Sequence, residues 1–123
     1  MGRVMENASQ LNVDARIKSL IESFAQYQPP FSSLGTPFLA DTEATEALVS
    51  MGSTAVPALL EALASDNAKL AMYAAYCLGL IGDRTALPAL RRTDGYYMAK
   101  EPKEEYDYGA ISAVRRAVER LDK

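Results

Sequence analysis

Residues 70–82 read Leu70-Ala71-Met72-Tyr73-Ala74-Ala75-Tyr76-Cys77-Leu78-Gly79-Leu80-Ile81-Gly82. Small or apolar residues fill positions 70, 74, 77, 78 and 81, which is the spacing of one buried face of an α-helix. The same slots recur earlier in the chain as Ala40, Ala44, Ala47, Leu48 and Met51, and later as Ala110, Val114, Ala117, Val118 and Leu121. A repeated helix that cannot cover its own apolar face must stack on its neighbours, so the pattern predicts a helical repeat protein.

A second helical pattern precedes each copy. Ile17, Leu20, Ile21 and Phe24 follow the spacing i, i+3, i+4, i+7, and the same spacing returns at Val56, Leu59, Leu60 and Leu63, then in shorter form at Leu87 and Leu90. The sequence therefore predicts an all-α fold, a short right-handed α-solenoid (alpha-alpha superhelix) of about three helical hairpins. We expect the repeat domain to span 14–123, with hairpins at about 14–52, 53–82 and 83–122. Residues 1–13 carry no clear period and are expected to form a flexible N-terminal tail.

Two long connections interrupt the hairpins. Prolines and glycine break any helix between 28 and 40, and the segment 93–106 is irregular and rich in tyrosine and charge. In a stack of hairpins both connections flank the same rim, where a binding face often lies.

Composition narrows the range of functions. The chain has 123 residues, a net charge of −3 and no histidine, which removes the usual general base and the usual metal ligand. Its single cysteine, Cys77, occupies a buried slot and is expected to be a core residue. We expect no catalytic residue, no metal and no cofactor. Without a secretory signal or a long apolar run, we also expect a cytoplasmic protein with no membrane contact.

Charge is distributed unevenly along the chain. No lysine or arginine lies between Lys18 and Lys69, whereas six acidic residues do: Glu22, Asp41, Glu43, Glu46, Glu61 and Asp66. An acidic front half does not suit nucleic-acid binding, which needs a basic stripe. A solvated surface with chance asymmetry explains the pattern equally well.

Two segments resemble a known repeat. They are Ala47-Leu48-Val49-Ser50-Met51-Gly52-Ser53-Thr54-Ala55-Val56-Pro57-Ala58-Leu59-Leu60-Glu61-Ala62-Leu63 and Cys77-Leu78-Gly79-Leu80-Ile81-Gly82-Asp83-Arg84-Thr85-Ala86-Leu87-Pro88-Ala89-Leu90. Both resemble the HEAT-repeat consensus of the phycobilisome-lyase type (PBS lyase HEAT-like). The resemblance implies that the hairpins are HEAT-like and that relatives include phycobilin lyase subunits and cyanobacterial-type scaffolds. Where such repeats carry an inner-helix arginine, this chain has Asp41, Ala71 and Ile111.

The three repeated helices share one phase, so their flanks can be compared. On one flank the middle copy carries Tyr73, Tyr76 and Leu80. The equivalent residues are Glu43, Glu46 and Ser50 in the first copy and Ala113, Arg116 and Arg120 in the third. We call these nine positions the inner flank; it changes from acidic to aromatic to basic, and aromatic residues flanked by charge are typical of protein-binding hot spots. In the alternative, Tyr73 and Tyr76 cover the joint with a neighbouring helix.

The opposite flank of the middle copy is small throughout, with Ala71, Ala75 and Gly79. This composition predicts close approach by a neighbouring helix. In the second long connection, Tyr96 and Tyr97 are expected either to extend a binding rim or to fold back over the last helix.

These patterns together predict a non-catalytic protein–protein interaction scaffold or adaptor. The candidate partner-binding residues are Glu43, Glu46, Tyr73, Tyr76, Leu80, Tyr96, Tyr97, Arg116 and Arg120. The expected partner is another protein, with a phycobiliprotein or a lyase partner implied by the resemblance, and self-association stays open. The alternative is a bilin (phycobilin) lyase-like or phycobilisome-associated subunit that handles a tetrapyrrole, for which the two inner tyrosines could stack on the ligand.

Overall fold

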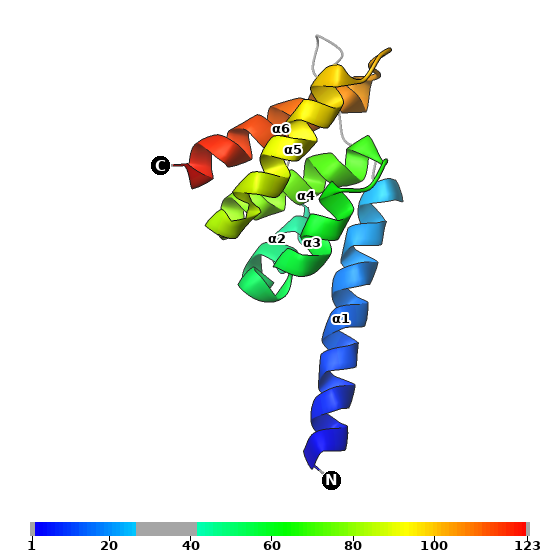
Figure 1. Ribbon diagram of the computed structural model, residues 1–123. Coiled ribbons are helices and arrows are strands. Elements are labelled where there is room, and N and C mark those ends of the chain that lie inside the picture. Colours follow the sequence, from blue (N-terminus) through cyan, green and yellow to red (C-terminus); the bar gives the residue numbers. More distant parts are fainter. Residues whose placement is uncertain (1, 27–41, 123) are drawn as a thin grey trace.

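The computed structural model describes residues 2–26 and 42–122, and in these ranges it is helical with no strand (Figure 1). The elements are α1 (Gly2–Gln26), α2 (Glu43–Met51), the 3₁₀ turn η1 (Gly52–Thr54), α3 (Val56–Leu63), α4 (Ala68–Ile81), the 3₁₀ turn η2 (Arg84–Ala86), α5 (Leu87–Ala99) and α6 (Glu105–Leu121). The predicted all-α repeat architecture is confirmed. The hand of the superhelix stays a prediction, and the expected loop 28–40 lies outside the described residues.

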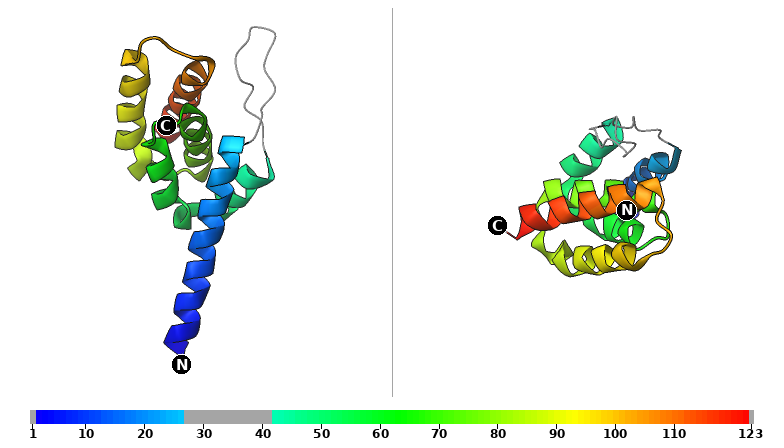
Figure 2. Two further views of the ribbon diagram at one scale, coloured as in Figure 1. Left: turned by 90° about the vertical axis from the view of Figure 1, so that its right-hand side faces the viewer. Right: turned by 90° about the horizontal axis from the view of Figure 1, so that it is seen from above.

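The first helix differs from the prediction at its start. It begins at Gly2 rather than near Asp14, so residues 2–13 are helical where a loose tail was expected. No proline or glycine follows Gly2 before the end of α1, so nothing in the backbone stops the helix. The N-terminal part of α1 runs well past the other helices (Figures 1 and 2).

Local caps define the other helix starts. The Thr42 hydroxyl accepts from the backbone N–H of Thr45 at 3.1 Å, and the Thr45 hydroxyl accepts from the Thr42 N–H at 2.7 Å, which is a capping box. The Asn67 side chain accepts from the N–H of Leu70 at the start of α4. Gly82 ends α4 with a φ of +84°, a left-handed conformation that glycine adopts without strain.

The fifth helix is longer than predicted. The segment 93–106 was expected to be irregular, yet α5 continues to Ala99 and α6 begins at Glu105. Gly95 does not interrupt α5, and space around it is open. The ammonium of Lys103 donates to the carbonyls of Met98 and Lys100, which satisfies acceptors left open where α5 ends. The long-loop prediction is therefore wrong here: only 100–104 connect the two helices.

Helix α4 lies at the centre of the packing. It contacts four other helices, α1, α2, α3 and α6, and its contact with α6 is the most extensive in the structure. Ala71, Ala75 and Gly79 are all buried, which confirms the predicted role of the small flank. A Cβ atom built on Gly79 would lie 3.0 Å from the Cα of Ala117 on α6. Cys77 is likewise buried, as expected for a core residue.

Gly79→Val tests this close approach. We expect the variant to lower the free energy of unfolding by about 1–3 kcal/mol, because the added methyl groups push against the α6 backbone. Urea denaturation followed by circular dichroism measures the change. Gly95→Val is the matched control: a Cβ at Gly95 meets nothing within 4 Å, so its effect should stay within about 0.5 kcal/mol. Equal losses for the two variants would contradict the close-packed α4–α6 contact.

Candidate functional site

Most of the predicted inner flank is accessible. Glu43, Glu46 and Ser50 are exposed on α2, and Arg116 and Arg120 are exposed on α6. On α4, Leu80 is 36% exposed and Tyr76 is partly exposed. Both α2 and α6 pack against α4. The Arg120 Cδ lies 3.5 Å from where a Gly79 Cβ would be, so the basic end of the flank adjoins the α4 residues beside Leu80.

Tyr73 is not accessible, and its prediction as a partner-binding residue is wrong. Its side chain is fully buried and stacks on Phe24 of α1, with ring centroids 4.6 Å apart and an interplanar angle of 9°. Helix α1 covers this side of α4, so the alternative, in which Tyr73 covers a joint with a neighbouring helix, is confirmed for this residue. Ala113, the equivalent position on α6, is also buried.

The arginines of the last hairpin fall into two groups. Arg115 of α6 pairs with Asp94 of α5 at 3.0 Å. Arg91 of α5 pairs at 3.5 Å with Asp122, the residue that follows α6. Within the described residues, by contrast, Arg116 and Arg120 form no ion pair. The same is true of Glu43 and Glu46 at the acidic end of the flank. These four exposed charges are therefore available to an external partner.

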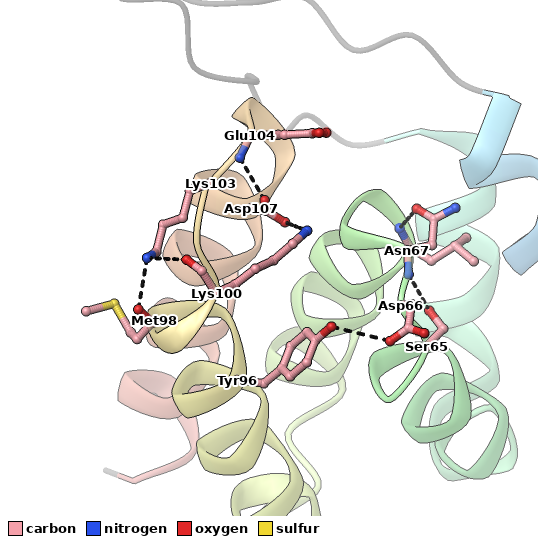
Figure 3. Close-up of polar contacts among 10 residues, drawn as sticks. Ser65, Asp66, Asn67, Tyr96, Met98, Lys100, Lys103, Glu104 and Asp107 are labelled. Atoms are coloured by element: carbon pink, nitrogen blue, oxygen red, sulfur yellow. Dashed lines mark hydrogen bonds and ion pairs between the residues drawn. The ribbon is translucent and has the colours of Figure 1, made fainter.

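Tyr96 and Tyr97, which were expected in a rim loop, lie on helix α5 instead. Figure 3 shows Tyr96 on this helix. Tyr96 is 50% exposed, and its hydroxyl donates to the Oδ1 of Asp66, in the turn between α3 and α4, at 3.4 Å. Tyr97 is 1% exposed and meets Tyr96 edge-on, with ring centroids 4.9 Å apart. The partner-binding prediction for Tyr97 is therefore wrong, because this side of α5 faces the core.

Burial changes the acidity of Tyr97. The pKa of its phenol is raised to about 12, mainly because burial removes water from the charged form, with Tyr96, Asp107 and Asp66 acting in the same direction. In the described part of the chain, its buried hydroxyl has no hydrogen-bond partner. This hydroxyl is thus a local cost to stability rather than a binding group.

Lys100 and Lys69 hold the same end of the molecule together, and Figure 3 shows the contacts of Lys100. Lys100 donates to the buried Asp107 at 2.9 Å, and this hydrogen bond raises the pKa of Lys100. Asp107 also accepts from the backbone N–H of Glu104 at 2.7 Å, which caps α6. Lys69 on α4 donates to the carbonyl of Ala25 at 3.4 Å, with its ammonium 5.0 Å from the ring centroid of Tyr106. Nothing in the sequence pattern singled out Lys69, since its partners come from α1 and α6.

A groove of about 790 Å³ lies between α1 and α3, and sequence reasoning did not find it. Its lining residues are Asp14, Ile17, Lys18, Ile21, Glu22, Ser53, Thr54, Pro57, Ala58, Glu61, Ala62, Ser65 and Leu70. The periodicity of α1 and of α3 is visible in the sequence, but the groove depends on how these two helices lie against each other, which the sequence pattern does not give.

Across residues 2–26 and 42–122, no cluster of acidic residues and cysteine has the geometry to hold a metal ion. None of the helices in these ranges combines the length and apolar character needed to cross a bilayer.

Paired helices stacked on a shared core define a helical repeat protein. The family model of the PBS lyase HEAT-like repeat matches residues 42–65 and 70–93, which confirms the resemblance seen in the sequence. Each match begins in or just before an inner helix and extends into the outer helix that follows it. Comparisons with curated proteins and with solved structures gave no significant match.

Alanine substitutions at Tyr73 and Tyr76 compare a buried tyrosine with a partly exposed one. Tyr73→Ala should cost about 3–5 kcal/mol, because it leaves a large cavity beside Phe24. Tyr76→Ala should cost clearly less, since part of that side chain is already in water. Urea denaturation of both variants measures the difference, and comparable losses would contradict the burial of Tyr73 under α1.

Tyr97→Phe tests the buried phenol. We expect it to raise the free energy of unfolding by about 1 kcal/mol, because a buried hydroxyl without a partner is removed. The wild type should also lose stability as the pH rises from about 10 toward 12, since the unfolded phenol ionises before the folded one. The variant should lose less in that window. Urea denaturation across this pH range, with absorbance titration of tyrosinate, measures both effects; identical curves would contradict the raised pKa.

Proposed function

We propose that this protein is a non-catalytic scaffold that binds another protein through the accessible part of the inner flank. The residues assigned to this surface are Glu43, Glu46, Tyr76, Leu80, Arg116 and Arg120. One observation carries the proposal: exposed acidic residues on α2 and exposed basic residues on α6 form no ion pair in the described structure, and both helices pack on the helix that exposes Leu80.

The chemistry of this surface suits protein binding. Tyr76 and Leu80 form an apolar centre that loses water when a partner binds. The charged residues on α2 and α6 on either side orient the partner and increase the association rate. Arginine is enriched at such interfaces because its planar group makes paired hydrogen bonds with carboxylates. We infer a partner surface with acidic groups opposite α6 and basic groups opposite α2. The same proposal includes a cytoplasmic location and binding of the partner without a cofactor.

The alternative is a phycobilisome-associated subunit that handles a tetrapyrrole, which the name of the matched repeat family supports. The burial of Tyr73 weakens this alternative, because only Tyr76 of the two proposed stacking rings is partly accessible. A bilin-binding titration followed by absorbance distinguishes the two: a spectral shift with the wild type that is lost in Tyr76→Ala would favour the alternative.

Charge reversal tests the scaffold proposal. Arg116→Glu with Arg120→Glu should weaken capture of the specific protein partners by at least about tenfold, because the partner's acidic groups then meet like charges. Affinity purification from the native host with quantitative mass spectrometry measures the loss. Arg84→Glu with Arg92→Glu is the matched control, since it changes the net charge equally at two exposed arginines before and on α5. Partners that survive the first pair as well as the control would overturn the proposed surface.

A further inference from the structure

The groove between α1 and α3 has an apolar floor. Ile17 and Ile21 are buried on α1, and Ala62 is buried on α3. Ala58 and Leu70, which also line the groove, are partly exposed. Apolar side chains from both walls therefore meet in one open depression on the outer-helix side of the molecule.

The edges of the groove are acidic. Glu22 is exposed on the α1 wall and Glu61 is exposed on the α3 wall. Neither forms an ion pair within the described ranges. Among the lining residues that the structure describes, Lys18 is the one cation. The sequence supplies no further lysine or arginine before Lys69, which is buried and bound to the α1 carbonyl of Ala25. The excess of acidic residues gives the groove a negative electrostatic potential, which attracts positively charged groups.

The shape of the groove points to a helix as its occupant. The lining residues of α1 fall on one helical face from Asp14 to Glu22, which spans about 12 Å, and α3 offers a wall of similar length. Small-molecule sites enclose most of their ligand, whereas this depression has exposed residues along both walls. The acidic edges also disfavour nucleic acid and carboxylate ligands, because their charge would be repelled.

We propose that the α1–α3 groove binds a basic amphipathic helix of a partner protein, about two turns of which fit between the two walls. Apolar side chains of that helix pack on Pro57, Ala58 and Leu70, which are the accessible apolar residues above the buried floor of the groove. Lysine or arginine side chains at its edges pair with Glu22 and Glu61. This surface is separate from the inner flank, because the groove lies between α1 and α3 whereas the inner flank lies on α2, α4 and α6. The proposal therefore does not depend on the scaffold proposal above.

A designed peptide tests the proposal. The probe is a fluorescein-labelled synthetic helix with leucines spaced i, i+3, i+4, i+7 and lysines on both sides of that stripe, and binding is read by fluorescence anisotropy. We expect saturable binding by the full chain. A peptide of the same composition in scrambled order, and one with glutamates in place of the lysines, should each bind at least about tenfold more weakly. Equal binding of the scrambled peptide, or no binding at millimolar concentration, would overturn the proposal.

Variants of the protein locate the site. Glu22→Lys with Glu61→Lys should weaken binding at least about tenfold, and Ala58→Leu should weaken it by partly filling the groove without a change in charge. Glu43→Lys with Glu46→Lys is the matched control, because it changes the net charge equally on the inner flank and should leave binding within about twofold. Circular dichroism confirms that each variant folds. If both charge-reversal pairs weaken binding equally, the attraction is general electrostatics and the groove assignment is wrong.

Discussion

The close approach of α4 to α6 is the contact on which the rest of the structure depends. A Cβ on Gly79 would stand 3.0 Å from the Cα of Ala117, so this approach requires the smallest residue on α4. Such contact lets two helices bury their faces over a long length without large side chains between them. Because α4 also packs against α1, α2 and α3, it links both ends of the described chain into one core.

This packing decides which polar residues remain available for binding. Helix α1 covers Tyr73, and the end of α5 turns Tyr97 into the core, so two aromatic residues that appeared suited to contact a partner serve stability instead. Arg115 pairs with Asp94 of α5, whereas its neighbour Arg116 forms no ion pair in the part of the chain that the structure describes. Adjacent residues on one helix thus have different roles because they face different elements.

Sequence periodicity predicted the buried slots of the repeated helices well, and it predicted the small flank of α4 correctly. It erred at Tyr73, because a single helix pattern does not show that a fourth neighbour, α1, covers the flank. It erred at 93–99 because local composition suggested a loop, whereas the helix end is determined by Lys103 and by Asp107, whose contacts span the connection. The groove could not be predicted at all, since it arises from the spacing of two helices that are distant in the chain.

The uneven charge of the sequence gains a physical meaning once the helices are placed. The absence of basic residues from 19 to 68 leaves α2 and α3 without any cation, and these helices contribute to different surfaces. On the inner flank, the acidic end on α2 is balanced by arginines on α6, so that surface is bipolar. At the α1–α3 groove the balance is only partial, because Lys18 is the one cation among the described lining residues, against Asp14, Glu22 and Glu61, and Lys69 is buried. One compositional bias therefore produces two surfaces with different electrostatic preferences, and the two can recognise chemically different partners.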